Sequence, residues 1–119
     1  MINNSGTLYL CATPIGNLED MTFRAVRVLK EADLIAAEDT RNSIRLLNHF
    51  DIHTPMTSYH EYNRIDKGYH LVSLLLEGKN IALLIYAGTP GISDPGEDLV
   101  TMCRDAALRV IFVSGVCSC

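Results

Sequence analysis

The residues best suited to binding a ligand lie in one ten-residue stretch, Ala87–Gly96, which holds three glycines and two prolines. Glycine lets a ligand approach the main chain closely, and proline stiffens the loop around it. The stretch follows the apolar run Ile81–Ile85, and Asp94 before Pro95 is typical of a helix start. A strand, a stiff loop and a helix N-terminus in this order favour ligand binding in open α/β sheets. The alternative is a surface turn that only connects two elements.

Of three further polar clusters, two carry side chains suited to acid–base chemistry or to anion binding. All three follow a predicted strand, and they comprise Thr13–Asn17, Glu38–Arg41 and His60–Asn63. His60 could act as a general base near neutral pH, Glu38 is a second candidate base, and Arg41 could hold a phosphate or a carboxylate. Each residue also has a simpler explanation, as a surface histidine, a helix-start carboxylate or a solvated arginine.

Nucleotide and metal chemistry lack their usual sequence support. Neither glycine-containing loop matches Gly-x-Gly-x-x-Gly, and the chain has no Gly-Lys-Ser or Gly-Lys-Thr. Cys117 and Cys119 have no second cysteine or histidine pair at metal-ligand spacing, so we expect no metal site. Cys11 falls in a predicted buried strand and Cys103 on the apolar face of a predicted helix, so we expect reduced, buried thiols.

Short apolar runs and helically spaced segments alternate along the whole chain. The predicted strands are Thr7–Ala12, Leu34–Ala37, Pro55–Tyr59, Ile81–Ile85 and Val110–Val113. The predicted helices run from Thr22 to Ala32 with Asp20 or Thr22 as cap, over the stripe Ile44, Leu47 and Phe50, from Ile65 to Leu76 with Gly78 at C′, and from Glu97 to Ala107.

This alternation, with short connections, predicts an α/β fold. We expect right-handed crossovers and a five-stranded, mostly parallel sheet with helices on both faces, in three α/β/α layers. Because the carboxyl ends of parallel strands share one edge of the sheet, the four polar clusters should converge on one cleft there.

Size and composition indicate one globular domain over residues 1–119. The chain is 48% apolar and has a net charge of −4. No apolar run approaches the roughly 20 residues that span a bilayer, and the N-terminus lacks the basic region of a secretory signal. We therefore expect a soluble cytoplasmic protein without a membrane partner. The acidic balance argues mildly against an independent nucleic-acid-binding module.

Four motifs, in order, resemble those of a known family. They are Ala12–Asp20, Ala36–Arg41, Ser58–Glu61 with Asn63, and Ala87–Gly96. Together they resemble the bacterial small-subunit ribosomal RNA cytidine 2′-O-methyltransferases, S-adenosyl-L-methionine enzymes of the tetrapyrrole methylase superfamily. The similarity runs from about Gly6 to Val113, which is nearly the whole chain.

The resemblance implies a two-domain enzyme of which this chain is the amino-terminal half, with the second domain absent. It also implies a homodimer, small-subunit ribosomal RNA as substrate, and S-adenosyl-L-methionine in the cleft between the domains. The implied catalytic base is His60 or Glu38. The implied cofactor-binding residues are Pro14, Gly16, Tyr86, Ala87, Gly88, Thr89, Pro90, Gly91, Ile92 and Gly115, and the implied substrate-side residues are Asp39, Arg41, Tyr59 and Asn63.

The sequence departs from the family pattern at two places. The family has aspartate where this chain has Tyr86, and Pro-Gly-Pro-Ser-Ala where this chain has Ser114–Cys119 with only Gly115 in register. An acid at the first position is associated with the donor's amino group, so its loss should weaken donor binding. Two alternatives stay open: a methylase of a tetrapyrrole or another small acceptor, and an inactive dimerisation or interaction domain. Glu38 and His60 argue against the first, because they mark the RNA-modifying branch of the family.

Overall fold

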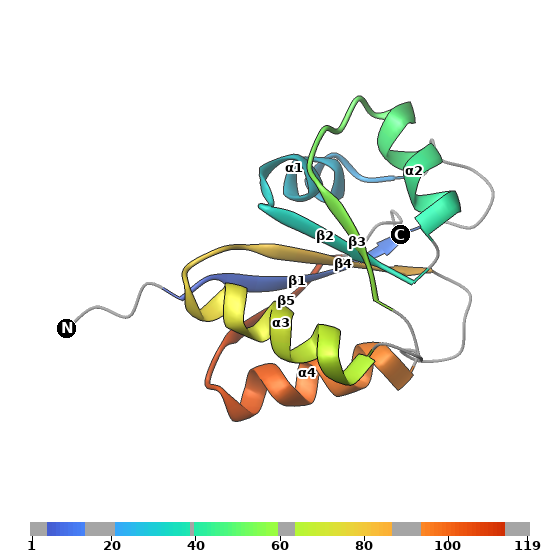
Figure 1. Cartoon of the computed structure of the whole chain (residues 1–119). Coiled ribbons are helices and arrows are strands. Elements are labelled where there is room, and N and C mark those ends of the chain that lie inside the picture. Colours follow the sequence, from blue (N-terminus) through green and yellow to red (C-terminus); the bar gives the residue numbers. More distant parts are fainter. Residues whose placement is uncertain (1–4, 14–20, 39, 60–63, 87–93, 114–119) are drawn as a thin grey trace.

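A computed structural model describes residues 5–13, 21–38, 40–59, 64–86 and 94–113, and within them strands and helices alternate (Figure 1). All five predicted strands and all four predicted helices are present. Their bounds are β1 Thr7–Thr13, α1 Phe23–Glu31, β2 Leu34–Ala37, α2 Thr40–His49, β3 Met56–Ser58, α3 Arg64–Leu76, β4 Ile81–Tyr86, α4 Asp94–Asp105 and β5 Arg109–Val113.

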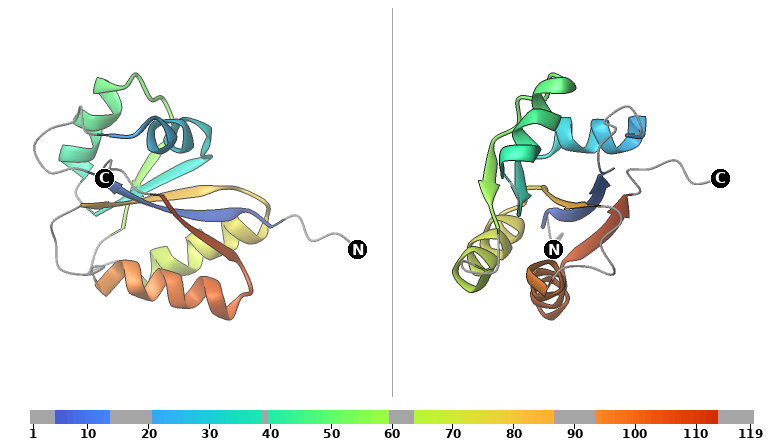
Figure 2. Two further views of the ribbon diagram at one scale, coloured as in Figure 1. Left: turned by 180° about the vertical axis from the view of Figure 1, so that it is seen from behind. Right: turned by 90° about the vertical axis from the view of Figure 1, so that its right-hand side faces the viewer.

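The strands form one sheet in the order β3-β2-β4-β1-β5, and every pairing is parallel. Helices α1 and α2 cover one face and α3 and α4 cover the other, as the two further views show (Figure 2). The predicted three-layer α/β/α architecture is therefore confirmed. The chain runs outward from β1 to β2 and β3, then returns to place β4 between β2 and β1. Because crossovers are right-handed, the outward and return helices lie on opposite faces.

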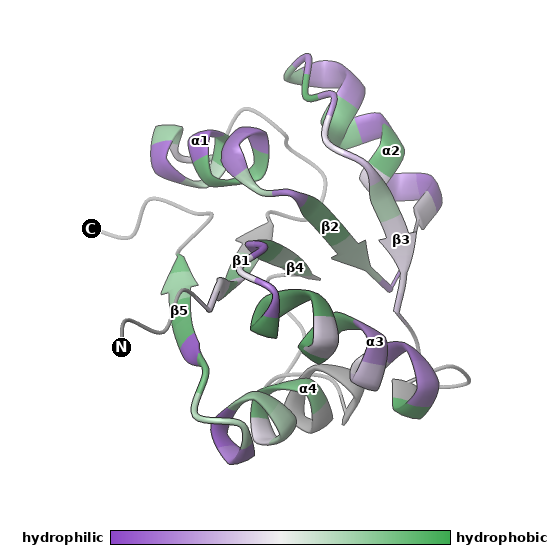
Figure 3. Ribbon diagram, turned by 60° about the vertical axis from the view of Figure 1, so that its left-hand side comes forward, coloured by the Kyte–Doolittle hydropathy of each residue, from purple (hydrophilic) through white to green (hydrophobic). Residues whose placement is uncertain are grey.

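Each face of the sheet has its own hydrophobic core. Along β4, Ala82 and Leu84 belong to the core beneath α1 and α2, whereas Ile81 and Leu83 belong to the core beneath α3 and α4. A parallel strand buried on both faces requires a continuous apolar run, and β2 and the greater part of β4, Ile81–Ile85, are correspondingly hydrophobic (Figure 3). Among the described residues, Ser43 is the one buried side chain that is polar.

The helix starts follow local capping, with two differences from expectation. The Thr22 side chain accepts a hydrogen bond from the Ala25 N–H at 3.1 Å, so the predicted cap of α1 is confirmed. Helix α4 begins at Asp94 itself, one residue earlier than an N-cap role implies. Helix α2 begins at Thr40, before the predicted stripe. The prediction missed this first turn because its residues are polar and show no apolar periodicity.

Three helices end in the same motif, with a left-handed residue at C′. After α3, the Gly78 N–H donates to the Leu75 carbonyl at 3.0 Å and the Lys79 N–H donates to the Leu74 carbonyl at 3.1 Å, a Schellman pair. The predicted role of Gly78, with φ of 99°, is confirmed. The corresponding residues after α2 and α4 are Asp51, with φ of 57°, and Ala107, with φ of 58°.

The amino edge of the sheet is tied together by Asn80. The Thr7 N–H donates to Asn80 Oδ1 at 2.9 Å, and the Asn80 N–H donates to Asp33 Oδ2 at 2.8 Å. The starts of β1, β2 and β4 are thus joined. Gly6 adds close backbone packing, since a Cβ there would lie 1.7 Å from the Lys79 carbonyl oxygen. This edge is closely packed backbone, and polar side chains follow the strands at the opposite edge.

We expect Ala107→Gly to stabilise the protein and Gly78→Ala to destabilise it. A non-glycine residue in the left-handed region costs about 1–2 kcal/mol, whereas glycine loses about 0.5–1 kcal/mol more backbone entropy on folding. Ala107→Gly should therefore raise the free energy of unfolding by about 0.5–1 kcal/mol, and Gly78→Ala should lower it by about as much. Urea titrations measure both, and a loss of stability in Ala107→Gly would contradict this account.

We expect both buried cysteines to resist alkylation while the protein is folded. Cys11 and Cys103 are free and buried, as expected from sequence, and they belong to different cores on opposite faces of the sheet. Burial raises the pKa of Cys11 to about 12 and the pKa of Cys103 to about 11, so both thiols are neutral near pH 8. Their contribution to stability is present below pH 9 and is lost as the pH rises through these values. Iodoacetamide labelling by peptide mass spectrometry, with denatured protein as control, tests this; native labelling at the denatured rate would refute it.

Candidate functional site

The carboxyl ends of the strands lie at one edge of the sheet. Thr13 at the end of β1 pairs in register with Tyr86 at the end of β4, and Ala37 at the end of β2 pairs with Leu84. On the other side of β2, the same Ala37 pairs with Ser58 at the end of β3. The four segments that contain the polar clusters therefore start from the same edge, as parallel strands require.

The ends of β1 and β4 form the position at which α/β sheets bind ligands. The two strands are neighbours, but the chain leaves β1 toward α1 on one face and leaves β4 toward α4 on the other (Figure 1). Loops that diverge from adjacent strands in this way flank the ligand crevice of open α/β sheets. The segments after Thr13 and Tyr86 are the two that sequence assigned to the cofactor.

A shallow polar depression lies at the end of β2 and the start of α2. It is lined by Glu38, Thr40, Arg41 and Asn42, and both charged side chains are exposed. The first turn of α2 directs its backbone N–H groups and the positive end of the helix dipole toward this edge. The depression thus combines a carboxylate that can accept a proton with a guanidinium and helix N–H groups that attract an anion.

Asn42 was not among the predicted site residues. The structure brings Asn42 into the site because α2 starts at Thr40, which places Asn42 in the first turn beside Arg41. The apolar stripe used to locate this helix starts later and could not show that turn.

Tyr59, predicted on the substrate side, belongs to the core beneath α3 and α4. Its side chain is 1% exposed and its N–H donates to the Ala37 carbonyl at 2.9 Å, which continues the pairing of β3 with β2. Gly68 of α3 lies close to its hydroxyl. This burial favours a packing role for the Tyr59 side chain, and its place on the substrate side stays a prediction.

The other predicted site residues stay predictions. Tyr86 is the last residue of β4, and only its backbone position is described. Outside the described residues lie Pro14, Gly16, Asp39, His60, Asn63, Ala87, Gly88, Thr89, Pro90, Gly91, Ile92 and Gly115.

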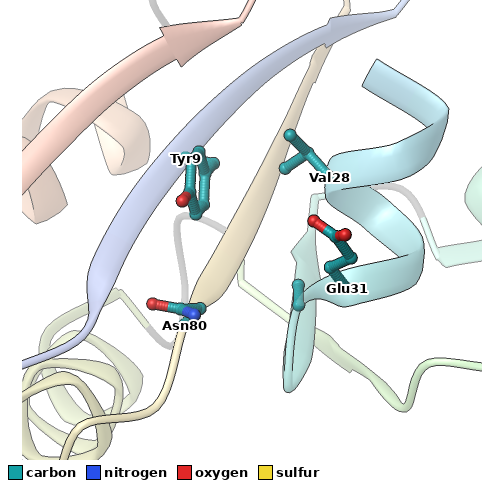
Figure 4. A pocket seen from close by; sticks show the side chains of 5 residues that line it. Tyr9, Val28, Glu31 and Asn80 are labelled. Carbon is teal, nitrogen blue, oxygen red and sulfur yellow. The ribbon is translucent and has the colours of Figure 1, made fainter. Parts of the chain in front are cut away.

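A second hollow lies at the opposite edge of the sheet, between α1 and the starts of β1 and β4. Tyr9, Val28, Glu31 and Asn80 line it together with Ala32 (Figure 4). Its volume of about 50 Å³ accommodates water but not a cofactor, since small-molecule pockets enclose roughly 300–1,000 Å³. This hollow therefore lies apart from the candidate site at the carboxyl edge, and it is too small to hold a cofactor.

Neither a metal cluster nor a membrane span occurs in the described part of the chain. No three histidine, cysteine, aspartate or glutamate residues there are grouped as metal ligands would be. None of its helices has the length and apolarity needed to cross a bilayer.

Comparison with known proteins places the chain in a family. The profile of the tetrapyrrole (corrin/porphyrin) methylases matches residues 7–119. The chain belongs to this family. Among curated relatives, the ribosomal RNA small subunit methyltransferase I of Halalkalibacterium halodurans is 58% identical over 113 residues, and that of Synechocystis is 57% identical over 110 residues. These alignments cover 95% and 92% of this chain, which spans 39% of the length of each relative.

Solved structures of tetrapyrrole methylases share this fold. Uroporphyrin-III-C-methyltransferase from Thermus thermophilus aligns over 93% of this chain and 48% of its own, with a TM-score of 0.70 and 23% identity. Cobalt precorrin-4 methyltransferase aligns over 92% of this chain and 46% of its own, with a TM-score of 0.75 and 16% identity. These likenesses confirm the predicted fold, which matches about half of each solved chain.

Proposed function

We propose that this chain is the amino-terminal domain of an S-adenosyl-L-methionine-dependent methyltransferase that methylates the ribose 2′-hydroxyl of a cytidine in small-subunit ribosomal RNA. The observation that carries the proposal is 50–58% identity to relatives named ribosomal RNA small subunit methyltransferase I. This chain spans about two fifths of the length of these relatives, so the activity of the whole enzyme is proposed for it. A cytoplasmic location and a homodimer belong to the same proposal.

The place proposed for the methyl donor is the carboxyl edge between β1 and β4. S-adenosyl-L-methionine supplies a methyl group activated on a sulfonium. Support comes from the register of Thr13 with Tyr86 and from the positions of the following helices, α1 and α4, on opposite faces of the sheet. The residues proposed to hold the donor are Pro14, Gly16, Ala87, Gly88, Thr89, Pro90, Gly91, Ile92 and Gly115. Glycine-rich main chain can hold an amino-acid group and a ribose without a metal.

The proposed chemistry is an in-line displacement on the methyl carbon. The bond from carbon to sulfur breaks, a bond from carbon to the ribose oxygen forms, and the hydroxyl proton passes to a protein base. We assign this base to His60, with Glu38 as the alternative. Support for Glu38 is its exposed carboxylate in the depression beside Arg41, whose guanidinium suits a ribose-phosphate backbone. Asp39 and Asn63 complete the proposed substrate side.

We expect Tyr86→Asp to strengthen binding of S-adenosyl-L-methionine. A carboxylate at the end of β4 would accept a charge-assisted hydrogen bond from the donor's amino group, an interaction worth about 1.5–3 kcal/mol, or about 10-fold to 100-fold in affinity. Titration calorimetry measures the change. Tyr69→Asp is the matched control, since Tyr69 is 65% exposed on α3. Unchanged affinity in Tyr86→Asp, or an equal gain in the control, would contradict the assignment.

We expect His60→Ala to lower turnover about 100-fold while changing donor affinity less than twofold, because general-base catalysis contributes roughly 10²–10⁴. The assay follows a labelled methyl group from the donor to small-subunit ribosomal RNA. His70→Ala, an exposed histidine on α3, is the control. Undiminished turnover would remove His60 from the mechanism and leave Glu38 as the base.

Absence of both donor binding and methyl transfer would instead favour the interaction-domain alternative. Methyl transfer to a tetrapyrrole but not to ribosomal RNA would favour the small-acceptor alternative.

A further inference from the structure

The charge of the chain is divided between the two faces of the sheet. Helices α1 and α2, on one face, contain five basic residues and one acidic residue, namely Arg24, Arg27, Lys30, Arg41 and Arg45 against Glu31. Helices α3 and α4, on the other face, contain five acidic and three basic residues, namely Asp66, Asp94, Glu97, Asp98 and Asp105 against Arg64, Lys67 and Arg104. The net charge of −4 for the whole chain does not reveal this difference between the two faces. We call the outer surface of α1 and α2 the basic face.

The cations of the basic face are directed away from the core. Ala25, Val28 and Leu29 fill the buried side of α1, and Ser43, Leu46 and Leu47 fill that of α2. All five basic side chains are exposed, and none forms a salt bridge or a hydrogen bond with another described residue. Lys67 on α3 contrasts with them, because its Nζ donates to Thr57 Oγ1 at 2.9 Å. The basic face is thus available for an external anion.

The basic face is continuous with the candidate site. Arg41 lines the depression at the carboxyl edge, and Arg45 follows one turn later along α2. Helix α1 starts at Phe23 on the same side of the molecule as the end of β1, so Arg24, Arg27 and Lys30 run from that edge toward the amino edge (Figure 1). A polyanion bound along these helices would reach the depression at one end.

An exposed aromatic ring favours a nucleic-acid strand as this polyanion. Phe23, the first residue of α1, is 96% exposed beside Arg24 and Arg27. Unpaired bases stack on such rings while arginine and lysine hold the phosphates. A membrane surface is a poorer match, because most apolar side chains of the two helices are buried in the core and only Phe23 and Ile44 are exposed.

We propose that the basic face binds the RNA substrate, with Arg27, Lys30 and Arg45 on its phosphates and Phe23 stacked on a base, and so directs the strand to the carboxyl edge. This inference rests on the proposed function for the identity of the polyanion. It adds a surface remote from the reacting atoms, and it explains how a chain of net negative charge can hold RNA.

The test measures binding of a fluorescein-labelled hairpin RNA by anisotropy, without methyl donor, from about 50 to 200 mM salt. We expect Arg27→Gln with Arg45→Gln to weaken binding about tenfold at the lower salt and to reduce the salt slope by about 2, one unit for each lost phosphate contact. Phe23→Ser should weaken binding about tenfold with an unchanged slope, because stacking releases no counterions. All replaced side chains are exposed, so circular dichroism should show an unchanged fold.

The matched control is Lys79→Gln with Arg104→Gln, which makes the same change in net charge at exposed positions outside the basic face. It should leave affinity within twofold. Equal weakening by both double variants, or none by the first, would overturn the proposal. Stronger binding to phosphatidylserine vesicles than to RNA, lost with Arg27→Gln and Arg45→Gln, would also overturn it in favour of a membrane surface. The experiment separates this inference from the proposed function because it contains no methyl donor. RNA binding that depends on the basic face supports the inference even where donor binding and methyl transfer fail. Those failures count against the proposed function alone.

Discussion

The carboxyl edge depends on the insertion of β4 between β1 and β2. Six register pairs join β4 to β1 and four join it to β2, so the last strand but one is the centre of the sheet. This position makes β1 and β4 neighbours while their following helices lie on opposite faces. It also sets Tyr86, the residue before the glycine-rich segment, in register with Thr13. The proposed donor site depends on this pairing of β4 with β1.

The two edges of the sheet have different tasks. At the amino edge, the Gly6 backbone, the Asp33 carboxylate and the Asn80 side chain join the strand starts, and the described residues leave only a small hollow there. At the carboxyl edge, the strands end in polar side chains such as Glu38 and Arg41 that the core does not use. The contacts that join the strand starts thus lie at the edge opposite the proposed reaction. The two helical faces differ likewise, since basic residues gather on α1 and α2 and acidic residues on α4.

Much of the fold followed from periodicity. The runs Leu34–Ala37 and Ile81–Ile85 are apolar because both faces of their strands are buried, and their bounds were predicted within one residue. The buried faces of α2 and α3 were predicted less well, because some of their apolar side chains are exposed. Ile44, used to locate α2, is 48% exposed, and the buried positions include Ser43. On α3, Ile65, Tyr69 and Leu76 are exposed, whereas Leu71 and Leu75 face the core. A side chain's apolarity shows that it can be buried, not that a neighbour covers it.

By itself the sequence determined which segments become strands and helices, the parallel direction of the sheet and the C′ role of Gly78, and it narrowed the cap of α1 to Asp20 or Thr22. These depend on local propensity and on connections too short for other topologies. It also carried the motifs that place the chain in its family. Only the tertiary structure decided the order of the strands, the burial of Tyr59, and the separation of charge between two faces. Those properties arise from contacts between residues far apart in the chain, and neither composition nor local spacing records which distant segments become neighbours.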